Sequence, residues 1–217
     1  MIEQRTGKWI VALTGASGVQ YAITLLRVLA EHPDVNEVHV ILSEAAHRVL
    51  QEEENIKISF SSLNSQTLLG IESKKLLFFS PKDIAAPAAS GSFRTDGMVI
   101  VPCSMSTLAS VAHGIQQNLI HRAADVVLKE SRKLILVPRE TPLSQIHLEN
   151  MLKLSKMGVS IAAAMPGFYH QPQSLDDLIK MQCMKILDCM QLENSLVQRW
   201  KESENQEKKR KLNLIKI

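Results

Sequence analysis

Six apolar segments, rich in β-branched residues, recur along the chain and constrain its fold more than any other feature. Each is continuously apolar rather than alternating, which is typical of strands buried on both faces of a sheet. Segments with helical periodicity lie between them, as at 21–32, 44–54 and 119–131. Strand and helix therefore alternate, which predicts a parallel sheet. The six segments are WIVALT (9–14), VHVIL (38–42), KLLFF (75–79), MVIVP (98–102), KLILVP (133–138) and VSIAAA (159–164).

This alternation predicts a doubly wound α/β sandwich with a mainly parallel sheet, in which ligands bind at the carboxyl ends of the strands. We expect residues 1–200 to form one domain and 201–217 to be a charged tail. The loops after the strands should then hold the informative residues, and each is polar or contains Gly or Pro. They are TGASG (14–18), Ser43, PCSMST (102–107), PRETP (138–142) and MPGFYHQP (165–172).

Composition excludes several functional classes. The net charge of +3 comes from the tail, where residues 201–217 hold six Lys or Arg against three Glu, so a nucleic-acid partner is not expected. No apolar run reaches the ~18 residues of a membrane span, and no secretion signal is recognisable. The three cysteines, Cys103, Cys183 and Cys189, lack metal-type spacing and favour free thiols in a cytoplasmic protein. We expect no metal site, because His147 and His170 have no second ligand at metal spacing.

The TGASG loop (14–18) predicts an anion site, since Gly15 and Gly18 flank Ser17 where a strand passes into a helix. It lacks the dinucleotide fingerprint, and the second strand ends in Ser43 rather than an acid suited to a ribose, so FMN fits better than NAD. The alternative is an ordinary tight turn that uses glycine for its geometry.

Other strand-end residues have two interpretations each. The segment Ser104–Thr107 supplies either helix caps or donors to a flavin. The pair Arg139 and Glu140 is either a solvated turn or part of a site. Lys129, Arg139, Tyr169 and Lys185 could bind phosphate only if they converge at one edge of the sheet. We interpret Cys103 as a packing residue rather than a nucleophile.

Over roughly residues 9–200, the chain resembles the UbiX-type flavin prenyltransferases. The resemblance rests on several long motifs in order: TGASGVQY, ASGS (89–92), NLIHRAADVVLKE, LVPRETPLSQIHLENMLKLSKMG and PGFYHQPQS. It implies a flavodoxin-like, Rossmann-like three-layer sandwich that binds flavin, and a homododecamer with sites where subunits meet. It also implies a metal-independent transfer of a dimethylallyl group from dimethylallyl phosphate to reduced FMN. Alkylation at N5 and ring closure at C6 would give prenylated FMN for a UbiD-type decarboxylase, as in ubiquinone biosynthesis.

The resemblance also implies roles for individual residues. Glu140 matches the family's acid/base, with Ser17 beside it, and Glu53 is similar to a site acid, although the run EEE (52–54) leaves that register open by one. The FMN contacts would be Gly15, Ala16, Ser17, Ser43, Ser104, Met105, Ser106, Thr107 and Arg139. The prenyl-phosphate site would comprise Tyr169, Lys185, the loop residues Ser90 and Gly91, Arg122 and Lys129 from a neighbouring subunit, and Trp200 as a closing aromatic.

The chain departs from the family pattern at two positions. Relatives often have Arg where this chain has Lys185, and some have Trp at the position of Ile84, so the choice between monophosphate and pyrophosphate donors stays open. Two other functions are possible. One is an FMN-dependent cysteine-type decarboxylase, but that group resembles PASANT where this chain has PAASGS. The other is a non-catalytic FMN carrier subunit.

Overall fold

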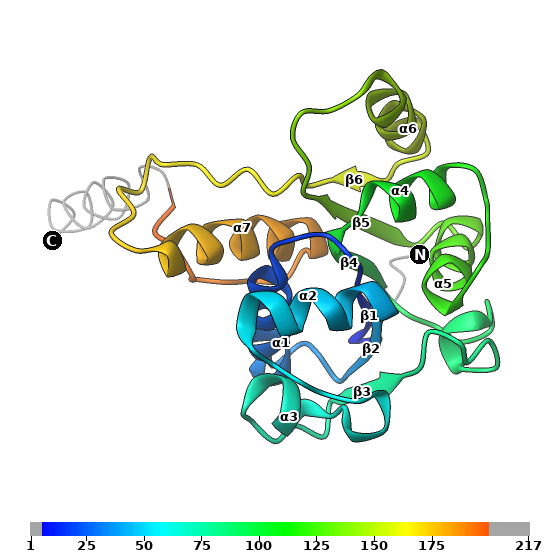
Figure 1. Cartoon of the computed structure of the whole chain (residues 1–217), viewed down its shortest axis with the longest axis horizontal. Helices are drawn as coiled ribbons and strands as arrows, with labels where there is room; N and C mark the ends of the chain where they lie inside the picture. The colour runs from blue at the N-terminus through cyan, green and yellow to red at the C-terminus, as the bar shows by residue number, and fades with distance from the viewer. Residues whose placement is uncertain (1–5, 200–217) are drawn as a thin grey trace, which may run out of the picture.

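The six predicted strands form one sheet in the computed structural model, which describes residues 6–199 (Figure 1). All pairings are parallel, and the order is β3-β2-β1-β4-β5-β6. The chain therefore winds outward from β1 to β3, then returns to the other side of β1 for β4 to β6. This confirms the predicted doubly wound fold. The strands are β1 (Lys8–Leu13), β2 (Glu37–Leu42), β3 (Leu76–Phe79), β4 (Gly97–Cys103), β5 (Lys133–Pro138) and β6 (Ser160–Ile161).

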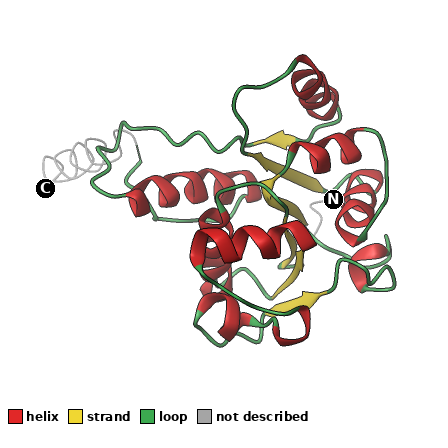
Figure 2. Ribbon diagram, in the orientation of Figure 1, coloured by secondary structure: helices red, strands yellow, loops and turns green. Residues whose placement is uncertain are grey.

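Helices cover both faces of the sheet and complete three layers (Figure 2). Helices α1, α2, α3 and α7 pack on one face, and α4, α5 and α6 pack on the other. The helices are α1 (Val19–Glu31), α2 (Glu44–Glu54), α3 (Ser65–Leu69), α4 (Met105–Ala112), α5 (Leu119–Lys129), α6 (Gln145–Lys156) and α7 (Leu175–Met190), with short 3-10 turns η1 (Phe60–Ser62) and η2 (Pro87–Ala89).

Burial on both faces explains why the strand sequences are continuously apolar. In β1, Trp9, Val11 and Leu13 contact the core under α1 and α7, whereas Ile10 and Ala12 contact the core under α4 and α5. All five side chains are buried. Because successive residues of a strand point to opposite faces, a central strand needs apolar residues at every position.

The sixth strand is shorter than the predicted 159–164, since regular pairing stops at Ile161. β6 is an edge strand and pairs only with β5. The chain nevertheless stays alongside β5, because the amides of Ala162 and Ala164 donate to the carbonyls of Leu136 and Pro138 at 2.8 and 2.9 Å. The loop that follows is thereby held at the end of β5.

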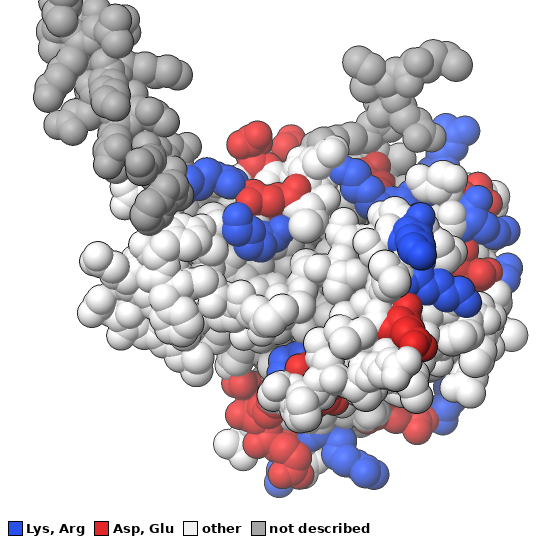
Figure 3. All heavy atoms as spheres, turned by 90° about the horizontal axis from the view of Figure 1, so that it is seen from above, with Lys and Arg blue, Asp and Glu red and all other residues white. Residues whose placement is uncertain are grey.

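The surface shows no single-sign stripe on the face seen in Figure 3, where Lys and Arg are interspersed with Asp and Glu around a broad uncharged area. Among the helices of the described residues, none is long and apolar enough to cross a membrane. The predicted tail, 201–217, and Trp200 lie outside the described residues.

Candidate active site

The carboxyl ends of β1 and β4 are adjacent where the strand order reverses. Thr14, in the loop after β1, forms hydrogen bonds with the segment that ends β4 and begins the next loop. Its hydroxyl donates to the carbonyl of Pro102 (2.8 Å) and accepts from the amide of Ser104 (2.7 Å). Its own amide donates to the same Pro102 carbonyl at 3.2 Å. Thr14 is 1% exposed, so these bonds are shielded from water. The structure thus brings the 14–18 and 104–107 loops together, as predicted, through a residue that we had not identified as important.

The 14–18 loop depends on its two glycines. A side chain at Gly15 would collide with the Cβ of Ala45, so glycine lets the loop lie against α2. Gly18 is the N-cap of α1 with φ 102°, a conformation that L-residues rarely adopt. Between them Ala16 is buried and Ser17 is exposed. The tight-turn interpretation is therefore correct for both glycines, and it leaves Ser17 accessible.

Glu53 supplies the anion at the start of α1. Its carboxylate accepts from the amides of Gly18 (2.9 Å) and Val19 (3.1 Å), although Glu53 belongs to the end of α2. Helix N-termini attract anions because their first amides have no intrahelical acceptor. This contact distinguishes Glu53 from Glu54, which instead accepts from the side chain of Gln20. Which of the acids at 52–54 serves the site stays a prediction. In the described residues the Glu53 carboxylate pairs with these two amides, so the prediction that a ligand anion binds at this loop stays a prediction.

The hydroxyls of 104–107 act as helix caps and bond to one another. Ser104 is the N-cap of α4, where its hydroxyl accepts from the amide of Thr107 (3.3 Å) and lies 3.1 Å from the hydroxyl of Ser106. Ser43 has the same role in α2, accepting from the amide of Ala46 at 3.0 Å. The capping interpretation of 104–107 is thus confirmed, and Ser43 is a cap that we did not predict. Both caps lie at the carboxyl edge, with Met105 partly buried beneath it.

Arg139 joins the end of β5 to the same crevice. Its Nε donates to the carbonyl of Ser17 at 3.3 Å. Its charge also opposes, more weakly, the rise in the pKa of Tyr21 that burial and the nearby Cys183 cause. Glu140 is exposed, and its carboxylate accepts from the amide of Thr141 (3.0 Å). Among the ion pairs of residues 6–199, none joins Arg139 to Glu140, so the two side chains serve separate purposes.

Tyr169 contacts α7, and Lys185 lies on that helix. The Tyr169 hydroxyl donates to Sδ of Met181 (3.6 Å), and Lys185 follows Met181 by one helical turn. Lys185 lines an open groove of about 560 Å³ between α7 and the segment 161–165. Because Ala164 is bonded to Pro138, this groove borders the strand end that carries Arg139.

Arg122, Lys129, Ser90 and Gly91 form a second group. The Nε of Arg122 donates to the carbonyl of Ala89 (3.1 Å), and Lys129 lies 3.7 Å from the carboxylate of Glu130. The hydroxyl of Ser90 lies 2.8 Å from that of Ser92, while Gly91 lines a cavity at the amino edge of the sheet. Within one chain these residues do not join the Arg139 crevice. The prediction that Arg122 and Lys129 act on a neighbouring subunit's site stays a prediction.

The cysteines have the character of packing residues. Burial raises the pKa of Cys183 to about 12, and the fully buried Cys103 is shifted in the same direction. A thiol needs to ionise to act as a nucleophile, so neither is suited to that role. Among residues 6–199, no group of three or more His, Cys, Asp or Glu side chains could hold a metal ion.

Comparison with known proteins identifies the family of the chain. The flavoprotein family model matches residues 2–198. The flavin prenyltransferase UbiX of Alkalihalophilus pseudofirmus is 50% identical over 192 residues, covering 88% of this chain and 95% of that protein. A dodecameric FMN-dependent UbiX-like decarboxylase from Escherichia coli O157:H7 is 44% identical, with a TM-score of 0.80 over 89% of this chain and 98% of the other.

AnUbiX (PadA1), solved in complex with FMN and dimethylallyl pyrophosphate, is 40% identical with a TM-score of 0.80, over 91% of this chain and 98% of that one. The peptidyl-cysteine decarboxylase EpiD is only 16% identical, with a TM-score of 0.54, so the likeness to the cysteine decarboxylases is one of fold alone. Together with the crevice at β1 and β4, these matches show that the chain is a flavoprotein and belongs to the family of UbiX-type flavin prenyltransferases.

Proposed function

We propose that the chain transfers a dimethylallyl group from dimethylallyl phosphate to reduced FMN, making prenylated FMN for a UbiD-type decarboxylase in the cytoplasm. The observation that carries the proposal is the adjacency of two places: the Arg139 crevice at β1, β4 and β5, and the Lys185 groove beside Pro138. The first can hold a flavin and the second a phosphate, so the two co-substrates would lie side by side.

The residues of the crevice fit a flavin. Gly15 lets the backbone lie close to α2, the Ser17 side chain is accessible, and Arg139 brings a cation to the same loop. We assign the remaining contacts to Ala16, Ser43 and the segment 104–107, whose caps line the same edge. Reduced FMN, when bound there, would supply an electron-rich ring with a nucleophilic N5.

The groove fits the leaving phosphate. Breaking an allylic C–O bond places negative charge on the departing phosphate, and donors that meet this charge lower the barrier. Lys185 supplies an ammonium group and Tyr169 a hydroxyl at the same helix. Arg122 and Lys129 would add charge from a neighbouring subunit, together with the loop at Ser90 and Gly91, and we place Trp200 as the aromatic that closes the site.

Glu140 would act as the general acid and base in this reaction, accepting a proton and returning it. Its exposed carboxylate stands next to Arg139 in sequence, and within residues 6–199 it bonds only to the amide of Thr141. A carboxylate without an ion-pair partner can accept a proton and return it. Ser17 shares the loop that Arg139 contacts, and Glu53 holds the start of α1 behind it.

Assembly into a homo-oligomer, as in the dodecameric relative, is part of this proposal. Helix α6 packs on the core through Leu154 near the β6 edge of the sheet (Figure 1), but it also presents large apolar side chains to solvent. Ile146, Leu148 and Leu152 are 67%, 52% and 55% exposed. Apolar patches of this kind mark protein contacts, and a second copy of the chain is the partner we propose.

Anaerobic incubation with reduced FMN and dimethylallyl phosphate, followed by mass spectrometry of the released flavin, tests the activity. We expect a flavin heavier by one C5H8 unit. Glu140→Gln should bind FMN normally but form the adduct slowly, whereas Glu72→Gln, at an exposed acid on the loop before β3, should match the unchanged protein. Bound but unmodified flavin, with both the monophosphate and the pyrophosphate donor, would instead favour the decarboxylase or carrier alternatives.

A further inference from the structure

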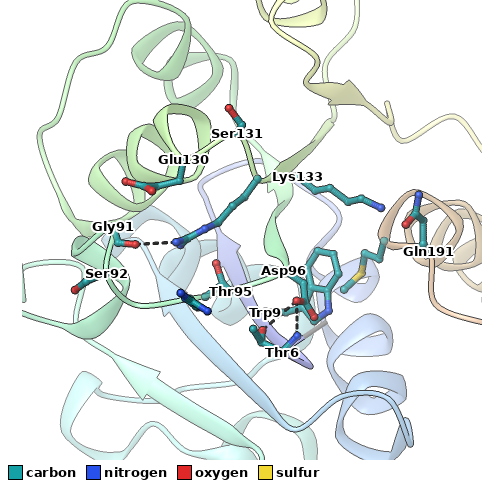
Figure 4. A pocket seen from close by; sticks show the side chains of 13 residues that line it. Thr6, Trp9, Gly91, Ser92, Thr95, Asp96, Glu130, Ser131, Lys133 and Gln191 are labelled. Atoms are coloured by element: carbon teal, nitrogen blue, oxygen red, sulfur yellow. Dashed lines mark hydrogen bonds between the residues drawn. The ribbon is translucent and has the colours of Figure 1, made fainter. Parts of the chain in front are cut away.

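A second cavity lies at the amino edge of the sheet, at the opposite ends of the strands from the flavin crevice. It has a volume of about 890 Å³, which falls within the ~300–1,000 Å³ of small-molecule pockets. Trp9 and Lys133 line it from the beginnings of β1 and β5, and Thr95 lines it from the segment before β4 (Figure 4). Gly91, at its rim, also belongs to the loop assigned above to the prenyl-phosphate site, whereas Trp9, Arg94 and Thr95 have no part in the proposed transfer.

Two buried polar groups in its wall have no partner. Trp9 is 2% exposed and Thr95 is 6% exposed. Neither the indole N–H of Trp9 nor the hydroxyl of Thr95 has a hydrogen-bond partner among the described residues. Figure 4 shows the Thr95 hydroxyl pointing into the space beneath Ser131. Buried polar groups are nearly always paired, so the unpaired Thr95 hydroxyl, which points into the cavity, indicates that something else binds there.

The acids and one base of the cavity are already engaged. The carboxylate of Asp96 accepts from the amide (2.7 Å) and hydroxyl (3.0 Å) of Thr6 and from the amide of Gly7 (2.8 Å). Arg132 donates to the carbonyls of Gly91 and Phe93, both at 2.7 Å. The capacity for further hydrogen bonds therefore lies with other groups in the wall.

The remaining capacity is for donation. Arg94 lines the cavity with a guanidinium that makes no hydrogen bond or ion pair within residues 6–199. The indole of Trp9 can only donate, and the Thr95 hydroxyl can donate or accept. A guanidinium together with neutral N–H and O–H donors recognises an oxyanion. We propose that this cavity binds a small organic oxyanion, a carboxylate or a phosphate ester, through Arg94, Trp9 and Thr95.

Trp9 reports on this site directly. The chain has two tryptophans, so Trp200→Phe leaves Trp9 as the sole indole. We would titrate the FMN-loaded, assembled Trp200→Phe protein with inorganic phosphate and, separately, with succinate, while following tryptophan emission. A saturable change is expected with at least one of them, and the responding probe identifies the class of anion.

Arg94→Gln and Arg48→Gln form a matched pair on this background, because Arg48 is exposed on α2, away from the cavity lining. Arg94→Gln should weaken binding about tenfold or more, as expected when a charge-assisted hydrogen bond is lost, and Arg48→Gln should not. An absent response, or an equal one in both variants, overturns the proposal. So does a response that appears only after residues 1–5 are removed, since the chain itself would then fill the cavity.

Discussion

Replacing Thr14 by Val tests whether the flavin crevice depends on the single hydroxyl that joins its two loops. Valine has nearly the same shape, so the change removes the hydroxyl without opening a cavity. The carbonyl of Pro102 keeps a bond from the Thr14 amide at 3.2 Å, but the amide of Ser104 loses its acceptor at 2.7 Å. The variant therefore isolates one unpaired N–H at the start of the 104–107 loop.

The expected loss of folding stability follows from the unpaired amide of Ser104. Leaving a shielded donor unpaired costs about 1–3 kcal/mol, so the free energy of unfolding should fall by roughly 2 kcal/mol. For a chain of this size that corresponds to about 4–8 °C in Tm. If the loop shifts to pair the Ser104 amide with water, FMN should bind about tenfold more weakly, which is ~1.4 kcal/mol.

Flavin fluorescence titration and thermal unfolding of the apo-protein measure the two effects. Thr14→Ser is the matched control, because it keeps the hydroxyl and should retain FMN affinity within a small factor. If Thr14→Val bound FMN as tightly as the unchanged protein and unfolded at the same temperature, the hydroxyl would not hold the loops. Weak binding by Thr14→Ser as well would point to the methyl group instead.

Three further results are expected. Glu53→Gln should lower the free energy of unfolding in urea by about 0.3–1 kcal/mol, because it removes negative charge from the start of α1. Glu52→Gln, at an exposed position without that contact, should leave this free energy unchanged. Equal losses in the two variants would contradict the capping role of Glu53. Lys185→Arg should lower the KM for dimethylallyl phosphate, because a guanidinium can donate two parallel hydrogen bonds to the phosphate. A raised KM would indicate that the ammonium group of Lys185 is required. Cys103 and Cys183 should resist iodoacetamide at pH 8 in the folded protein because burial raises the pKa of each thiol, to about 12 for Cys183; alkylation of either, found by mass spectrometry, would contradict this.

The sequence was sufficient to predict the central sheet but not its edge. Helix α2 was predicted from its periodicity with its observed bounds, 44–54, and in the structure Ser43 caps its start and Asn55, with φ 55°, ends it. VSIAAA (159–164) has the same apolar pattern as a central strand, yet β6 pairs for only two residues. A strand's position in the sheet depends on the long-range order of the whole chain, which a local pattern does not contain.

The site was predictable where it depends on strand ends and unpredictable where it depends on side-chain direction. The loops at 14–18 and 104–107 and Arg139 converge because parallel strands share a carboxyl edge. That Glu53 reaches the start of α1 depends on how the far end of α2 crosses α1, which only the packed structure reveals. Arg139 and Glu140 follow the last residue of β5, and their sequence does not reveal that Arg139 contacts the 14–18 loop while Glu140 stays exposed.

The position of β1 between β2 and β4 has a consequence for how the protein acquires its ligand during synthesis. Trp9 aligns with Gly97 in the sheet, so the two walls of the crevice are separated by most of the first half of the chain. Such distant partners meet only after the intervening segment has been ordered, which slows folding. A nascent chain that has emerged only as far as β3 carries the 14–18 loop but not its counterpart. Flavin can therefore be captured only by chains in which β4 has paired with β1.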